Sequence, residues 1–122
     1  MTESYVFDTY ALMEIVMGNP VFLRYMESSK VVLNPFIFAE FCYGLLKRYP
    51  LEYKSFAAKV AGTVMPLEEE QIMQAMELRY ANKKKEMSTT DCISYIQAQK
   101  LGIPFLTGDG AFKGMPGVEV VK

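Results

Sequence analysis

The sequence contains no histidine, and only two of its 122 residues are cysteine. The absence of histidine removes the side chain that most often serves as a general base and as a ligand for transition metals. Cys42 and Cys92 lie fifty residues apart and form no C-x-x-C pair. This spacing implies neither a disulfide nor a thiolate metal site, so each cysteine is expected to be a small buried hydrophobic side chain.

Long uncharged runs are also missing. The longest are nine residues, 15–23 and 31–39, whereas a membrane span needs about 20. No lysine or arginine precedes Arg24, which is the wrong charge for a secretory signal peptide. Apolar residues still make up 51% of the chain, so a packed core is expected rather than disorder. We therefore expect a soluble, cytoplasmic protein with no membrane partner, folded as a single domain over residues 1–122.

Four stretches of the sequence contain a single charged residue each, and in every case that residue is an acid. The four acids are Asp8, Glu40, Asp91 and Asp109. A lone carboxylate among apolar neighbours is costly to desolvate unless a cation or strong hydrogen-bond donors compensate it. Four such residues are therefore better explained as ligands than as scattered surface charges. Because histidine is absent, they would form an all-oxygen site suited to Mg²⁺ or Mn²⁺.

The net charge of −1 is unusual for a protein that binds nucleic acid. The balance changes if the four isolated acids hold metal. Thirteen basic residues then face ten remaining acids, which leaves a net charge of +3 outside the site. A metal-loaded form would tolerate a polyanion that the metal-free form repels.

Short apolar runs alternate with helical patterns along the chain. Strands are expected over residues 5–7, 30–33, 103–107 and 118–121, with a brief one over 63–65. Helices are expected over residues 10–17, 20–27, 36–48, 52–61, 68–85 and 89–101. Asn19-Pro20 and Asn34-Pro35 are both helix-start signals, with asparagine as the cap and proline in the first turn. The alternation predicts an α/β fold with three α/β/α layers and a central parallel sheet.

This layout brings the four acids toward one end of the sheet. Asp8 and Asp109 are expected at the carboxyl ends of strands, where open α/β sheets build their sites. Asp91 is expected in the first turn of a helix, and Glu40 in the first or second turn of another. Purely structural roles would also explain three of them: Asp8 and Asp91 would serve as helix caps, and Asp109 would shape a turn. Glu40, inside an apolar helix, has no such local role.

Four segments, in this order, resemble the PIN domain, and most closely the VapC-type toxin nucleases of prokaryotic toxin–antitoxin pairs. The segments are Tyr5-Val-Phe-Asp8-Thr9, Asn34-Pro-Phe-Ile-Phe-Ala-Glu40-Phe, Ser88-Thr-Thr-Asp91 and Thr107-Gly-Asp109-Gly-Ala-Phe112. The resemblance spans nearly the whole chain. It implies a three-layer domain, a homodimer, and cleavage of RNA that depends on Mg²⁺ or Mn²⁺. It also implies a small antitoxin protein whose tail occludes the active site.

The four isolated acids are assigned as catalytic residues and as metal ligands, direct or through water: Asp8, Glu40, Asp91 and Asp109. Such ions lower the pKa of a bound water and stabilise charge on a phosphodiester, a scheme that requires no histidine. Thr9 and Thr107 are candidates to hydrogen-bond a ligand carboxylate or the attacking water, although ordinary turn hydroxyls would give the same pattern. Ala111 stands where many relatives carry another acid, which leaves a second metal position in question.

Three alternatives stay open. Lys83, Lys84 and Lys85 would meet RNA phosphates, but a solvated helix end explains them at least as well. The helix over residues 36–46 is apolar nearly all round, as expected either inside a core or at a dimer or antitoxin surface. The functional alternative, which Ala111 favours, is a PIN-like module that binds RNA or protein without cleavage.

Overall fold

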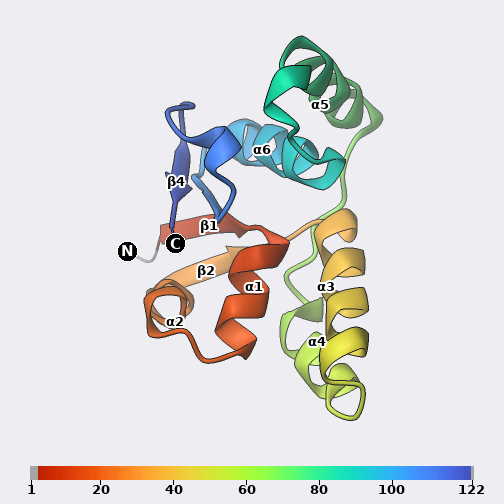
Figure 1. The fold of residues 1–122 in the computed structure, drawn as a ribbon, viewed down its shortest axis with the longest axis vertical. Helices are drawn as coiled ribbons and strands as arrows, with labels where there is room; N and C mark the ends of the chain where they lie inside the picture. Colours follow the sequence, from red (N-terminus) through yellow and green to blue (C-terminus); the bar gives the residue numbers. More distant parts are fainter. Residues whose placement is uncertain (1–2, 122) are drawn as a thin grey trace.

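The computed structural model describes residues 3–121. Its four strands are β1 Glu3–Phe7, β2 Ser29–Val32, β3 Phe105–Thr107 and β4 Val118–Val120. Its helices are α1 Thr9–Val16, α2 Pro20–Ser28, α3 Pro35–Arg48, α4 Tyr53–Ala61, α5 Glu69–Ala81 and α6 Thr89–Leu101, with two 3-10 turns, η1 Lys83–Lys85 and η2 Gly110–Phe112. The strands form one parallel sheet in the order β2-β1-β3-β4. Figure 1 shows α5 and α6 on one side of this sheet and α1 and α2 on the other. The predicted three-layer α/β/α fold is therefore confirmed.

The central strand β1 is buried on both faces. Val6 and Phe7 have no exposed surface, as expected for a parallel strand covered by helices on each side. Large buried rings fill the space between the layers, among them Phe22, Phe41 and Phe105. Removing a side chain of this size from water stabilises the fold by about 1.5–3 kcal/mol. The core thus holds the carboxyl ends of β1 and β3 in fixed positions.

Both asparagine–proline signals start helices as predicted. The Asn19 side chain accepts a hydrogen bond from the Val21 amide at the start of α2. The Asn34 side chain accepts from the amides of Phe36 and Ile37 at the start of α3. The side-chain oxygens thus satisfy amides that have no partner within the helix.

Two predicted elements differ in the structure. The helix expected over residues 68–85 ends at Ala81. The backbone of Asn82 leaves the helical conformation, with φ of −122° and ψ of 32°, and its side chain donates to the carbonyl of Leu78 in the last turn. Asparagine is a common helix terminator, and the three lysines therefore form the separate turn η1. The strand expected over 63–65 is a single bridge between Leu33 and Val64, because the chain turns away after one pairing.

None of the helices within residues 3–121 has the length and apolar character needed to cross a bilayer. Of the two cysteines, Cys92 is buried as expected, whereas Cys42 is half-buried, and both are free thiols.

Candidate active site

Asp8 follows β1 directly and is the most buried of the four predicted acids. Its side chain is only 2% exposed. One carboxylate oxygen, Oδ1, accepts from the Ala11 amide at 2.7 Å and so caps α1. The other, Oδ2, accepts from the Thr107 hydroxyl at 2.6 Å and from the Gly108 amide at 3.2 Å. Burial raises the pKa of this carboxyl, and these three donors oppose the rise in pKa because they favour the charged form.

Thr107, at the end of β3, joins two of the acids. Its hydroxyl donates to Asp8 and accepts from the backbone amide of Asp109 at 2.9 Å. The Asp109 side chain in turn accepts from the Ala111 amide at the start of η2. The threonine and the aspartate two residues later thus form one hydrogen-bonded unit at the carboxyl end of the neighbouring strands β1 and β3.

Glu40, in the second turn of α3, is exposed to solvent. Its carboxylate accepts a hydrogen bond of 2.7 Å from the hydroxyl of Thr9, the first residue of α1. The apolar sequence around Glu40 suggested a desolvated charge, but the structure corrects this expectation. The neighbours Phe41 and Ala39 belong to different faces of the helix, and only Phe41 is buried. Both predicted hydroxyls, those of Thr9 and Thr107, therefore donate to one of the predicted acids.

Asp91 lies in the first turn of α6. The Ser88 side chain caps this helix by accepting from the Asp91 amide at 3.0 Å. Among the described residues, no return hydrogen bond from the Ser88 amide to the Asp91 carboxylate is formed. The Asp91 carboxylate is not needed for the cap.

The carboxyl of Asp91 carries the largest electrostatic perturbation in the site. Burial is the first cause that raises its pKa, which reaches about 7. The negative charges of Asp8, Asp109 and Glu40 raise this pKa further. Like charges disfavour ionisation of a neighbouring carboxyl, so the part of this shift that burial does not cause reflects the proximity of the other three acids.

All four predicted acids line one cleft of about 270 Å³, which we call the acid cleft. Its lining residues are Asp8, Thr9, Tyr10, Glu40, Ser88, Asp91, Gly108 and Asp109. This lining, as far as the chain is described, contains four acids and no lysine or arginine. Uncompensated negative charge of this kind favours the binding of a cation.

The donor set of the acid cleft fits a hard divalent cation. Carboxylate oxygens are the ligands that Mg²⁺ prefers, and Mg²⁺ usually retains several waters beside one or two carboxylates. Within residues 3–121, however, no three acidic or cysteine side chains are arranged as a ready-made metal site. The structure thus brings the four acids into one cleft, and their direct ligation of a metal stays a prediction.

A buried amide network, missed by the sequence analysis, fixes α3 against α6. The Asn34 side chain has no exposed surface. Its amide nitrogen donates to the Ser94 hydroxyl at 3.1 Å and to the Gln97 side chain at 2.9 Å. Gln97 donates to the carbonyl of Leu33. This network holds the helix that carries Glu40 against the helix that carries Asp91. The Asn-Pro signal predicted the cap but contained no information on these long-range partners.

Tyr10 and Gly108 also line the cleft without having been predicted. The ring of Tyr10 lies so close to Gly108 that an added Cβ would approach its Cδ1 to 2.2 Å. Any larger residue would displace the ring, so glycine is required for this packing. The tight Gly-Asp-Gly loop gave a sequence signal for a turn, but not for this aromatic contact.

The fold and the site together define a known class of protein. The sequence pattern of the PIN domain family matches residues 5–118. The chain therefore belongs to the PIN domain family. No curated protein sequence matches it significantly.

Several solved structures share this fold. A toxin–antitoxin complex from Klebsiella pneumoniae superposes with a TM-score of 0.77 at 20% identity, covering 95% of this chain and 96% of that one. VapC20 from Mycobacterium tuberculosis, described as a toxin that cleaves the sarcin–ricin loop, gives a TM-score of 0.76 at 22% identity over 98% of this chain and 100% of its own. VapBC2 from Rickettsia felis, bound to promoter DNA, gives 0.75 at 15% identity, covering 98% and 99%. At these identities the likeness establishes the shared fold.

Proposed function

We propose that this protein is a divalent-metal-dependent ribonuclease, and the toxin of a type II toxin–antitoxin pair. The observation that carries the proposal is the acid cleft, in which four carboxylates face one another without a basic side chain. Membership of the PIN domain family supports the nuclease class. The similar fold of VapC20, a toxin that cleaves the sarcin–ricin loop, supports RNA as the substrate. A single nuclease domain over residues 1–122 is part of the proposal.

In this proposal Asp8, Asp91, Asp109 and Glu40 hold Mg²⁺ or Mn²⁺ directly or through water. A divalent ion held there would supply a water of lowered pKa and would stabilise negative charge on the phosphodiester. Thr107 orients Asp8 through its hydrogen bond of 2.6 Å. Thr9 orients Glu40 in the same way at 2.7 Å. Because Asp8 is held by three donors, it is the most rigid of the four candidate ligands.

Cleavage assays on RNA test the proposal. The purified protein is expected to cut RNA with Mg²⁺ or Mn²⁺ and to stop in excess chelator. Persistence of cleavage at full rate in chelator would contradict the metal-dependent mechanism. Binding of RNA without any metal-dependent cleavage would instead support the alternative, a PIN-like module that binds RNA or protein and does not cut.

Metal binding can be measured separately from activity. Mn²⁺ is expected to raise the melting temperature of the wild-type protein, since a ligand that binds only the folded state stabilises it. The Asp91→Asn variant should show a smaller rise, because a neutral amide is a poor ligand for a hard cation. Glu77→Gln removes an exposed acid of α5 and is the matched control. Equal responses in all three proteins would exclude Asp91 from a metal site.

The antitoxin partner of this proposal has a suitable surface. A groove of about 250 Å³ lies among α1, α2, α3 and α4, and its lining is mostly apolar: Leu12, Ile15, Val16, Leu23, Met26, Phe41, Phe56, Lys59 and Val60. An amphipathic helix binds in such a groove through apolar side chains three and four residues apart. The replacement Ile15→Glu is expected to abolish co-purification with a co-expressed antitoxin while RNA cleavage is retained.

A homodimer is also proposed, because α3 exposes large apolar side chains on its outer face. Phe36, Tyr43 and Leu46 are all exposed there. Light scattering at tens of micromolar is expected to report a dimer. Leu46→Glu should shift it to a monomer, since a charge would be buried in the interface. A wild-type monomer under these conditions would contradict the dimer.

A further inference from the structure

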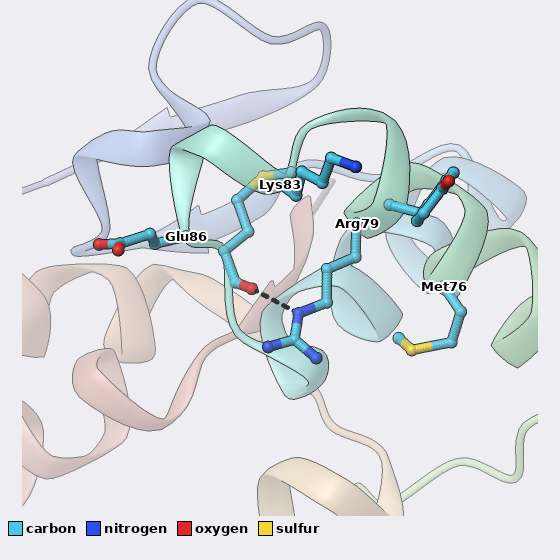
Figure 2. A pocket seen from close by; sticks show the side chains of 6 residues that line it. Met76, Arg79, Lys83 and Glu86 are labelled. Atoms are coloured by element: carbon cyan, nitrogen blue, oxygen red, sulfur yellow. Dashed lines mark hydrogen bonds between the residues drawn. The ribbon is translucent and has the colours of Figure 1, made fainter.

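A second cavity, of about 590 Å³, lies where α5 ends and the chain turns through η1. We call it the basic cavity. Its lining residues are Met76, Arg79, Tyr80, Lys83, Glu86 and Met87. Figure 2 shows Arg79 reaching from α5 across this cavity toward the backbone of Met87.

The Arg79 guanidinium is held in place from two directions. Its Nε donates to the carbonyl of Met87 at 3.0 Å, and its Nη1 donates to the hydroxyl of Thr89 at 2.9 Å. Neither acceptor is charged, so these bonds orient the guanidinium without neutralising it. A fixed and uncompensated guanidinium is well suited to contact a phosphate.

Tyr80 and Lys83 present an aromatic ring and a cation side by side. The Lys83 ammonium lies 4.7 Å from the centre of the Tyr80 ring, and the tyrosine is 75% exposed. Exposed rings next to basic groups are the common means of binding single-stranded nucleic acid, because every base has a face that can stack. Lys84 and Lys85 extend the positive charge along η1.

Glu86 is the only acid in the lining of this cavity as the structure describes it. Figure 2 shows its carboxylate directed away from the Arg79 and Lys83 side chains. Its backbone is left-handed, with φ of 55°, and this conformation turns the chain from η1 back to the buried Met87. The acid therefore shapes the cavity without cancelling its charge.

The basic cavity adjoins the acid cleft through a short piece of chain. Met87 lines the basic cavity, and the next residue, Ser88, lines the acid cleft. Thr89 accepts the hydrogen bond from Arg79 and begins the helix that carries Asp91. An RNA strand that leaves the acid cleft over Ser88 therefore meets the Arg79 guanidinium next.

We propose that the basic cavity binds the single-stranded RNA that flanks the scissile phosphate, with Tyr80 stacked on a base and Arg79 and Lys83 on phosphates. This inference rests on the proposed ribonuclease function and adds the position of the flanking strand. An acidic protein segment is the alternative occupant. The exposed ring and the adjacency of Met87 and Ser88, which line the two sites, favour RNA.

Binding is measured by the anisotropy of a fluorescein-labelled oligouridylate of roughly twelve nucleotides. The Asp91→Asn background separates binding from cleavage. Stacking of one base contributes about 1–3 kcal/mol, so Tyr80→Ala should weaken binding by roughly 5- to 150-fold. Tyr80→Phe keeps the ring and should bind like its parent. The side chain at position 80 is exposed, so neither replacement is expected to affect folding.

The lysine has a matched control on α3. Lys47 lies 4.7 Å from the centre of the Tyr43 ring, the same arrangement on a helix that contributes no residue to the lining of the basic cavity. Lys83→Gln should reduce the slope of log affinity against log salt by about one phosphate contact. Lys47→Gln should leave the slope unchanged. Equal slopes in the two variants and the parent, or equal losses in both variants, would overturn the inference.

The inference and the proposed function fail in different ways. Metal-dependent cleavage with a KM that Tyr80→Ala leaves unchanged overturns the inference and retains the ribonuclease. RNA binding that depends on Tyr80, in a protein that cuts no RNA, supports the inference and rejects the ribonuclease. Loss of antitoxin binding in Tyr80→Ala and Lys83→Gln, with RNA binding intact, identifies an acidic protein segment as the occupant and overturns the inference.

Discussion

The acid cleft and the basic cavity are lined by consecutive residues at Met87 and Ser88, yet they are built in opposite ways. In the acid cleft, Asp8 and Asp109 follow buried strands, and backbone amides or the Thr107 hydroxyl hold their carboxylates. In the basic cavity, Lys83 and Tyr80 are exposed side chains near the end of a helix, held mainly by each other. Only Arg79 there is fixed by hydrogen bonds.

This difference matches what each site would have to do. Chemistry requires groups held within a fraction of an ångström, and rigid strand ends and helix starts supply that precision. Affinity for a flexible polyanion depends on charge and stacking, which tolerate mobile side chains. Changes in the acid cleft should therefore alter rate, metal response and stability, whereas changes in the basic cavity should alter affinity alone.

The largest expected effect is on the rate of cleavage. Asp91→Asn should lower it by roughly a hundredfold or more, since the loss of a metal ligand exceeds the 10- to 100-fold cost of losing a supporting hydrogen bond. Single-turnover cleavage at saturating RNA measures the chemical step. Glu77→Gln, at an exposed position of α5, should cut at the wild-type rate. A loss in Asp91→Asn that appears only in KM would contradict the division between the two sites.

The next effect tests how firmly the acid cleft is supported. Asn34→Ala removes a helix cap and takes away the donor to the buried side-chain oxygens of Ser94 and Gln97, so it should destabilise the fold by about 2–4 kcal/mol. Asn19→Ala removes a cap with the same Asn-Pro sequence but no buried network, and should cost about 1 kcal/mol. Urea unfolding of both variants measures the difference. Equal losses would show that the network contributes nothing beyond the cap.

The third prediction concerns pH in the metal-free protein. The pKa of Asp91 is raised to about 7 in the folded state, against about 3.9 when unfolded. The folded state therefore binds this proton more tightly, so the contribution of Asp91 to stability is fully present below about pH 4 and is lost as the pH rises through about 7. After allowance for partial exposure we expect a fall of about 2 kcal/mol. Asp91→Asn should lack it, and parallel curves for the two proteins in chelator would refute the assignment.

The smallest expected effect is on stability, from a change in the lysine turn η1 beside the basic cavity. Lys84→Gln changes an exposed residue of η1 and should alter the free energy of unfolding by less than about 0.5 kcal/mol. The rise in melting temperature on adding Mn²⁺ should equal that of the wild type. Thermal melts with and without metal provide the measurement. A changed metal response in Lys84→Gln would mean that the two sites are not separable in this way.

The sequence predicted the rigid part of the molecule better than its exposed part. The apolar runs and the Asn-Pro caps located the strands and most helices, because burial and capping are local signals. The isolation of the four acids correctly indicated a shared location, although exposed Glu40 shows that isolation in sequence is not burial. The contact between Asn34 and Gln97, which are 63 residues apart, could not be predicted because neither residue's local sequence indicates the other.

The end of α5 is the clearest failure. The charge pattern favoured one helix to Lys85, since lysines stabilise a helix C-terminus. Asn82, which caps the helix after Ala81, outweighed this weak preference. As a result the three lysines occupy a turn between two helices, beside Tyr80 and Arg79. The basic cavity depends on that turn, and so it was not visible in the sequence.

The two tasks of Asp8 also constrain how this family member can change over evolutionary time. The same carboxylate starts α1 and lines the acid cleft, so a lineage that lost the proposed nuclease activity would still need a side chain that begins the helix. Asparagine and serine meet that need, whereas alanine does not. A relative without the proposed nuclease activity should therefore carry Asp8→Asn or Asp8→Ser in an otherwise intact fold. This conservative replacement would then indicate that the activity has been lost.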